Sequence, residues 1–136
     1  MLFTKASEYA LLSLIYISSR EFPQDVETVS KELGISRSFL AKILQNLARD
    51  GVLNSFKGAN GGFTLAKKTN DITLLEIVES AERHEMSVFD CSKSKDSCPK
   101  GETCQIWGMF NDIQNRLDEY LGGITLDDVL KKGSCI

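Results

Sequence analysis

The chain has 136 residues, of which 42% are hydrophobic and 26% charged, and its formal net charge is −3. This size fits one domain, or a small domain with an arm, and the composition is ordinary for a soluble globular protein. The apolar run at residues 11–17 is too short to cross a bilayer, and no small-residue cleavage site follows it. We therefore expect a cytoplasmic protein with no membrane partner, in which isolated thiols stay reduced.

The charge is distributed unevenly along the chain. Residues 33–68 carry six basic side chains against Asp50 alone, a balance of +5. Residues 71–136 carry seven basic against thirteen acidic side chains, a balance of −6. A basic block beside an acidic one is typical of a protein that binds nucleic acid with one region.

The first predicted helix runs from Lys5 to Ser19, with Thr4 as its N-cap and Pro23 beyond its end. Its apolar residues recur at spacings of three and four. A core stripe of Tyr9, Leu12, Ile15 and Tyr16, widened by Leu11, Leu14 and Ile17, predicts a largely buried helix.

Two short helices follow, joined by a glycine-containing turn. The first is capped by Asp25 and ends at Gly34; the second is capped by Ser36 and ends at Arg49. The second should bury Leu40, Ile43, Leu44 and Leu47. The pattern is typical of a helix-turn-helix, although an ordinary helical hairpin is the alternative.

A predicted β-hairpin decides between these alternatives. Residues 51–56 and 63–65 read as strands, and the glycine-rich residues 57–62 as the turn between them. A hairpin directly after a helix-turn-helix is a wing. The sequence therefore predicts a mainly α fold with a small β-hairpin wing: a winged helix-turn-helix that binds double-stranded DNA, plus a long dimerisation helix.

The predicted DNA contacts follow from this fold. Ser36, Arg37 and Ser38, at the start of the second short helix, would enter the major groove, where an arginine can make two hydrogen bonds to guanine. Lys42 is either a phosphate contact or a solvated surface charge.

On the wing, Lys57, Asn60 and Gly61 lie in the glycine-rich turn. They would reach the DNA backbone or the minor groove.

The acidic half contains an unusual segment with three cysteines, Cys91, Cys98 and Cys104, among serine, lysine and glycine residues. It has too few apolar side chains to pack a core, and thiolates are soft ligands, so the spacing predicts zinc or an iron–sulphur cluster. His84 is expected at the surface, and Cys135 is expected to be a bystander.

Helices are predicted on both sides of this segment. The helix from Leu74 to about Glu82 has Thr73 as its cap, and a helix from Thr103 to Leu121 carries a wide aromatic stripe that suits dimerisation. A short last turn starts at Thr125, and Lys131 to Ile136 should be a frayed tail. We assign residues 1–70 to the DNA-binding domain and 71–136 to the ligand loop and dimerisation helix.

The chain resembles, over nearly its whole length, the bacterial winged-helix iron–sulphur regulators typified by IscR, NsrR and RirA. The resemblance is carried by the N-terminal residues 3–11, the helix-turn-helix and the wing at 57–63. The helix start at 73–77 and the three cysteines before a long helix complete it.

This resemblance implies a homodimer on a palindromic operator, with one 2Fe–2S or 4Fe–4S cluster per subunit held by the three cysteines. Trp107 stands where IscR-like members have a histidine, and the first cysteine spacer is one residue longer than usual. Since NsrR-like members use a carboxylate near position eight, the resemblance implies that Glu8 of the partner subunit is the fourth ligand, with His84 as the weaker candidate.

The function implied is a transcriptional regulator, expected to be a repressor, whose cluster senses iron supply, oxygen or nitric oxide. The alternative keeps the winged helix and makes the cysteines a structural zinc site or a thiol switch. A thiol-redox enzyme is disfavoured because no two cysteines are separated by only two residues. We therefore expect no enzymatic activity.

Overall fold

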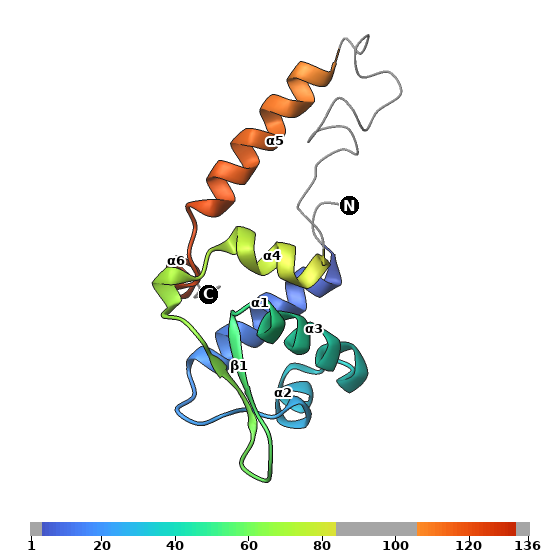
Figure 1. The fold of residues 1–136 in the computed structure, drawn as a ribbon, viewed down its shortest axis with the longest axis vertical. Coiled ribbons are helices and arrows are strands. Elements are labelled where there is room, and N and C mark those ends of the chain that lie inside the picture. Colours follow the sequence, from blue (N-terminus) through green and yellow to red (C-terminus); the bar gives the residue numbers. More distant parts are fainter. Residues whose placement is uncertain (1–3, 84–105, 133–136) are drawn as a thin grey trace.

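The computed structural model describes residues 4–83 and 106–132. Its elements are, in chain order, α1 (Lys5–Ser18), α2 (Val26–Leu33), α3 (Arg37–Arg49), β1 (Leu53–Phe56), β2 (Gly62–Leu65), the 3₁₀ turn η1 (Thr69–Asp71), α4 (Leu74–Glu82), α5 (Trp107–Gly122) and α6 (Leu126–Lys132). Figure 1 shows the β1–β2 hairpin at one end of the molecule and α5 rising from the other. This mainly helical architecture with one hairpin confirms the predicted fold class.

The helix-turn-helix forms because both ends of α2 are specified locally. The Asp25 carboxylate accepts a hydrogen bond from the Thr28 backbone N–H at 2.6 Å. Gly34 closes the helix in the left-handed region at φ 67°, which glycine adopts without strain. The predicted stripe of α3 is confirmed, since it buries Leu40, Ile43, Leu44 and Leu47.

The predicted core stripe of α1 is wrong at one position. Leu12 is 40% exposed, whereas Ala10 and Ser13 are fully buried. The reason is that α1 packs against α2, α3, α4 and β2, so its buried side is set by these neighbours rather than by its largest side chains. Ser13 tolerates burial because its hydroxyl donates to the Tyr9 carbonyl at 2.7 Å.

The wing is tied to the loop that joins α1 and α2. Strands β1 and β2 are antiparallel, with Phe56 opposite Gly62. The Gln24 N–H donates to the Phe63 carbonyl at 3.1 Å, and the Phe63 N–H donates to the Gln24 carbonyl at 2.9 Å. Gly62 has φ 146°, and a Cβ there would lie 2.5 Å from the Gln24 carbonyl carbon, so this crossing requires glycine.

The α4 helix completes the same core. Its cap is as predicted, with Thr73 Oγ1 accepting from the Glu76 N–H at 3.1 Å. Ile72 and Ile77 join one buried cluster with residues of α1 and α3, and Leu126 of α6 joins it from the C-terminal side. Packing therefore continues across residue 70, and the division into functional domains there stays a prediction.

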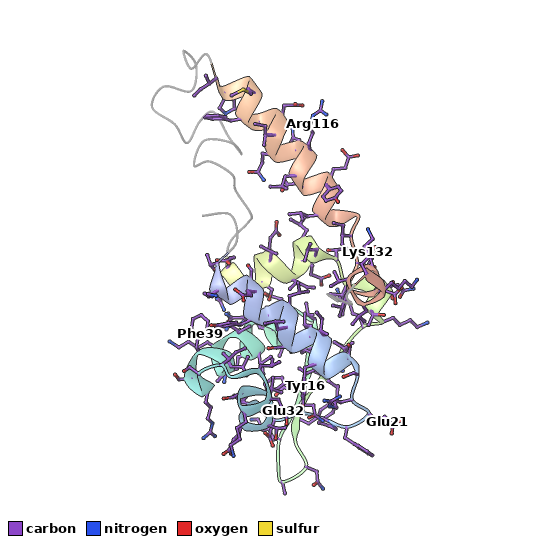
Figure 2. The ribbon with its side chains drawn as sticks, turned by 180° about the vertical axis from the view of Figure 1, so that it is seen from behind. Tyr16, Glu21, Glu32, Phe39, Arg116 and Lys132 are labelled. Carbon is purple, nitrogen blue, oxygen red and sulfur yellow. The ribbon has the colours of Figure 1, made fainter. Side chains whose placement is uncertain are left out.

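Among the described residues, the C-terminal part of α5 forms an apolar cluster with α4. Leu121 and Val78 are buried together, with Leu117 beside them. The part of α5 that precedes these residues extends away from the other helices, as the position of Arg116 in Figure 2 shows. The described helix runs from Trp107 to Gly122, and the predicted start at Thr103 lies outside the described residues.

The α6 helix follows directly. Thr125 and Asp128 cap it reciprocally: each backbone N–H donates to the other side chain, at 3.0 and 3.1 Å. Lys131 and Lys132 are its last residues, so the predicted tail began two residues too early. Among the described helices, none has both the length and the apolar character that a bilayer span requires.

Candidate DNA-binding face and cluster ligands

The first turn of α3 presents Ser36, Arg37 and Ser38 to solvent. Ser36 was predicted as a cap, but its side chain makes no hydrogen bond to the helix backbone; its Oγ lies 3.2 Å from Ser38 Oγ. The two hydroxyls therefore pair with each other at a helix N-terminus that has no side-chain cap. Such an end carries partial positive charge and free N–H donors, which suits a DNA phosphate.

The tertiary structure brings Arg37 next to the wing. Arg37, Phe56, Gly58 and Gly61 line one hollow of about 390 Å³, together with Asp25, the N-cap of α2. The predicted reading residue and the predicted wing contacts thus share one face of the molecule. This is the arrangement that lets one protein touch a groove and the adjacent backbone together.

The other predicted side-chain contacts are all exposed. Lys57 and Asn60 are exposed in the turn between the strands, and Lys42 is exposed one turn further along α3. Gly61 has a structural reason to be glycine: its N–H donates to the Gly58 carbonyl at 3.0 Å, and a Cβ would lie 2.3 Å from the Phe56 oxygen. Its contact with DNA stays a prediction.

Two residues of this face were not predicted as site residues. Phe56 ends β1 with 51% of its surface exposed and lines the hollow beside Arg37. The pKa of Asp25 is lowered, first by the Thr28 backbone N–H and to a smaller extent by the charge of Arg37. Asp25 was foreseen only as a cap, because its proximity to Arg37 depends on how α2 and α3 cross.

Glu8 lies on the exposed side of α1. Its Oε2 pairs with Lys5 Nζ at 3.1 Å, and the pKa of Lys5 is raised by this hydrogen bond. Glu8 also borders an apolar hollow of about 440 Å³ between α1 and α4, to which Leu11, Leu74 and Val78 contribute. An exposed lysine pair of this kind is weak, so the carboxylate is available as an oxygen ligand and fits the predicted role.

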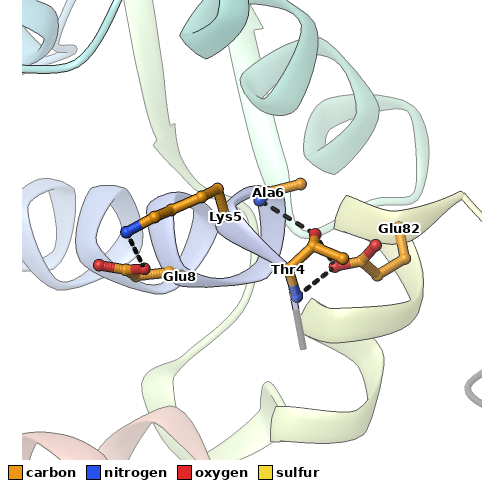
Figure 3. A network of polar contacts seen from close by, with 5 residues as sticks. All are labelled: Thr4, Lys5, Ala6, Glu8 and Glu82. Atoms are coloured by element: carbon orange, nitrogen blue, oxygen red, sulfur yellow. Dashed lines mark hydrogen bonds and ion pairs between the residues drawn. The ribbon is translucent and has the colours of Figure 1, made fainter. Parts of the chain in front are cut away.

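The start of α1 is fastened to the end of α4 by Glu82. Its Oε1 accepts from the Thr4 backbone N–H at 3.2 Å and from the Thr4 hydroxyl (Figure 3). It also accepts from the Ser7 hydroxyl at 2.6 Å. Sequence reasoning missed this network because its partners are at least 75 positions apart and carry no local signal. It places the beginning of α1 beside the end of α4.

The predicted ligands Cys91, Cys98 and Cys104 and the weaker candidate His84 lie outside the described residues, as does Cys135, which was expected to be a bystander. Within residues 4–83 and 106–132, no three His, Cys, Asp or Glu side chains come together as a metal site. The ligand set therefore stays a prediction.

The similarity to known proteins decides the family. The family model Rrf2, described as "Iron-dependent Transcriptional regulator", matches residues 3–132. The chain belongs to the Rrf2 family. This confirms the predicted resemblance and the absence of an enzymatic role, since the Rrf2 relatives are transcriptional regulators.

Curated Rrf2-like relatives match almost end to end. Protein aau3 of Rhizobium meliloti is 31% identical over 133 residues, covering 96% of this chain and 86% of that protein. The HTH-type transcriptional regulator IscR of Pectobacterium atrosepticum is 28% identical over 132 residues, covering 96% and 79%. The Rrf2 chain described here is accordingly a DNA-binding transcriptional regulator.

Solved structures share the Rrf2 fold. T. potens IscR has a TM-score of 0.75 at 20% identity, covering 98% of this chain and 89% of that one. B. subtilis CymR has a TM-score of 0.71 at 20% identity, covering 97% and 98%. At this identity the likeness speaks for the fold alone.

Proposed function

We propose that this Rrf2 protein is a homodimeric regulator, most simply a repressor, whose affinity for a palindromic operator is switched by an iron–sulphur cluster. The ligands are Cys91, Cys98 and Cys104 of one subunit and Glu8 of the partner subunit. The observation that carries the proposal is the position of Glu8: an accessible carboxylate on the helix whose start is fastened to the end of α4.

The ligand chemistry supports a sensor. A bound 2Fe–2S or 4Fe–4S cluster would supply sensitivity to oxygen, nitric oxide or iron supply. Three thiolates leave such a site one ligand short, and a carboxylate oxygen is a harder, more labile donor than a thiolate. To act as a ligand, Glu8 needs only to break its exposed ion pair with Lys5.

The packing supports a route from this site to DNA. Helix α1 contacts α3, whose first turn carries Arg37, and it also contacts α4. Binding of Glu8 to the cluster, or its release, would therefore shift α1, the helix against which α3 packs. Because paired half-sites lie about 34 Å apart on one side of the duplex, a small rotation of the two units would change affinity greatly.

The exposed face of α5 supports the homodimer. Ile106, Met109 and Ile113 are each more than 40% exposed, and Tyr120 is 68% exposed. A single subunit leaves this apolar stripe uncovered, which is costly in water. A second copy of α5 would cover it and would give the two-fold symmetry that a palindromic operator matches.

Anaerobic reconstitution with iron and sulphide tests the cluster. We expect a brown protein with broad visible absorption that fades on exposure to nitric oxide or oxygen. Glu8→Ala should lose the colour faster, while Glu32→Ala, which removes an exposed carboxylate of α2, should behave as wild type. A colourless protein that takes up only zinc would refute the cluster and favour the structural-zinc alternative.

Mixed dimers test whether Glu8 acts across the dimer. A subunit with Glu8→Ala, paired with one carrying Cys98→Ala, contains one complete site only if Glu8 serves the other subunit. We then expect the mixed dimer to keep a cluster as stable as that of wild type in about half of its sites, whereas the Glu8→Ala parent loses its cluster faster and the Cys98→Ala parent holds little. Equal loss in all three would mean that Glu8 serves its own subunit. Anisotropy titrations of holo and apo protein on operator DNA complete the test.

A further inference from the structure

A third hollow lies between α3 and α4, separate from the hollow beside Arg37 and from the hollow beside Glu8. Its volume is about 550 Å³, and Arg49, Asp50, Ser80 and Arg83 contribute to its wall. The end of α3 supplies the first two of these side chains, and α4 with its C-cap supplies the others. A ligand seated there would touch both helices at once.

Two guanidinium groups converge in this hollow. Arg83 Nη1 donates to Asn46 Oδ1 at 2.6 Å, and Arg49 Nη2 approaches the same oxygen at 3.4 Å. One amide oxygen therefore holds two like charges close together. Each guanidinium has five N–H donors, so both keep most of their donors for a further acceptor. A carboxylate can accept two parallel hydrogen bonds from the N–H groups of one guanidinium.

Two further features are unusual. The Ser80 hydroxyl is buried and has no hydrogen-bond partner. Among the described residues, it is the one buried side-chain polar group without such a partner. Arg83 has φ 66° and is the one non-glycine residue with positive φ in the part of the chain that the structure describes. Unpaired buried hydroxyls and left-handed backbone in bulky residues both occur preferentially at binding sites.

We propose that this hollow binds a free α-amino acid. Arg49 and Arg83 take its carboxylate, and Asp50 takes its ammonium group. The mixed charge of the wall, with the acidic side chains of Glu76 and Glu79 beside the arginines, disfavours a polyanion such as the DNA backbone. It suits a small zwitterion.

Such binding would act on DNA recognition without involving the cluster. Asn46 and Arg49 belong to α3, the helix that begins with Arg37, whereas Ser80 belongs to α4. A ligand that bridges them would set the angle of α3 against the rest of the body. The affinity for DNA would then depend on an amino acid independently of the cysteines.

Thermal unfolding of the full-length protein prepared without iron tests this. The probe is a panel of the twenty L-amino acids, each at about 10 mM. We expect one chemical group of amino acids to raise Tm by about 2 °C or more. The N-acetylated form of the same compound, and its amine without the carboxylate, should each raise Tm much less. No shift from any amino acid, or equal shifts from the blocked forms, would overturn the proposal.

Variants locate the effect. Arg49→Gln and Arg83→Gln should abolish the shift, whereas Arg116→Gln, which changes an exposed arginine on α5, should keep it. Asp50→Asn should remove the preference for the amino acid over its N-acetylated form. Calorimetric titration of each variant, with circular dichroism to confirm folding, repeats the comparison at one temperature. Retention of binding in both Arg49→Gln and Arg83→Gln would refute the site.

Discussion

The carboxylate of Glu82 accepts hydrogen bonds from both the backbone N–H and the hydroxyl of Thr4, 78 positions away. Thr4 is also the N-cap of α1, since its Oγ1 accepts from the Ala6 N–H at 3.2 Å. The N-cap residue of one helix is thus held by the last residue of another. A negative charge at this end also stabilises the α1 dipole. The start of α1, near Glu8, is therefore positioned by α4.

Glu82→Ala should destabilise the protein by about 1–3 kcal/mol, because the donors of Thr4 and Ser7 lose a charged acceptor in a partly buried place. Urea unfolding followed by circular dichroism gives the change in free energy. Glu32→Ala, on the exposed face of α2, should change it by less than about 0.5 kcal/mol. Equal effects of the two variants would mean that the Glu82 network contributes nothing.

The cap of α2 should show in the pH dependence of stability. The pKa of Asp25 lies below its ordinary value of 3.8, chiefly because the Thr28 backbone N–H donates to the charged form. A lowered folded pKa means that the stabilisation is complete above the unfolded pKa and is lost as pH falls through the folded one. Asparagine caps a helix without titrating. As the pH falls from about 5 to about 3, the free energy of unfolding of Asp25→Asn should therefore rise relative to that of wild type.

Unfolding free energies of both proteins at several pH values provide the measurement. At pH 6, Asp25→Ala should cost about 1 kcal/mol, because alanine cannot accept from the helix N–H groups. A constant difference between wild type and Asp25→Asn across the acid range would contradict the shifted pKa.

Arg37→Ala should weaken binding to the operator by about 1–3 kcal/mol and relax the sequence preference, if Arg37 reads a base. Anisotropy titrations on the operator and on a random duplex of equal length separate the two effects. An equal loss on both duplexes would show that Arg37 only contacts phosphate.

Lys57→Ala should weaken binding to operator and random DNA alike, because a wing lysine contributes a phosphate contact. The slope of log K against log salt should fall in magnitude by about 1. Lys31→Ala is the matched control: Lys31 is exposed on α2 and pairs with Glu27 at 3.3 Å. An unchanged salt slope for Lys57→Ala would remove the wing from the DNA interface.

Gly62→Ala should loosen the wing and weaken DNA binding, because its Cβ would lie 2.5 Å from the Gln24 carbonyl carbon and its φ of 146° disfavours a side chain. Gly58→Ala is the control, since it shares a positive φ but would meet no atom within 4 Å. We expect loss of hydrogen-exchange protection at Phe63 only in Gly62→Ala. Identical behaviour of the two variants would mean that backbone strain, not the crossing with Gln24, sets the cost.

The sequence by itself determined the elements whose signals are short-range. The Asp25 cap, the Gly34 stop and the buried stripe of α3 were all predicted correctly, as was the Thr73 cap of α4. In each case the deciding hydrogen bond or side-chain repeat spans only a few residues. Together with the wing, these local signals were enough to specify the winged helix and, through the resemblance, the family.

Only the tertiary structure decided which of these pieces touch. It exposed Leu12 and buried Ser13, joined Gln24 to Phe63, and placed the start of α1 on Glu82. It also brought Arg83 to Asn46, 37 positions away. Contacts over such separations depend on how whole helices pack, and no spacing within the sequence encodes them. The assignment of the cysteines as ligands stays a prediction, and it rests on composition and on the resemblance.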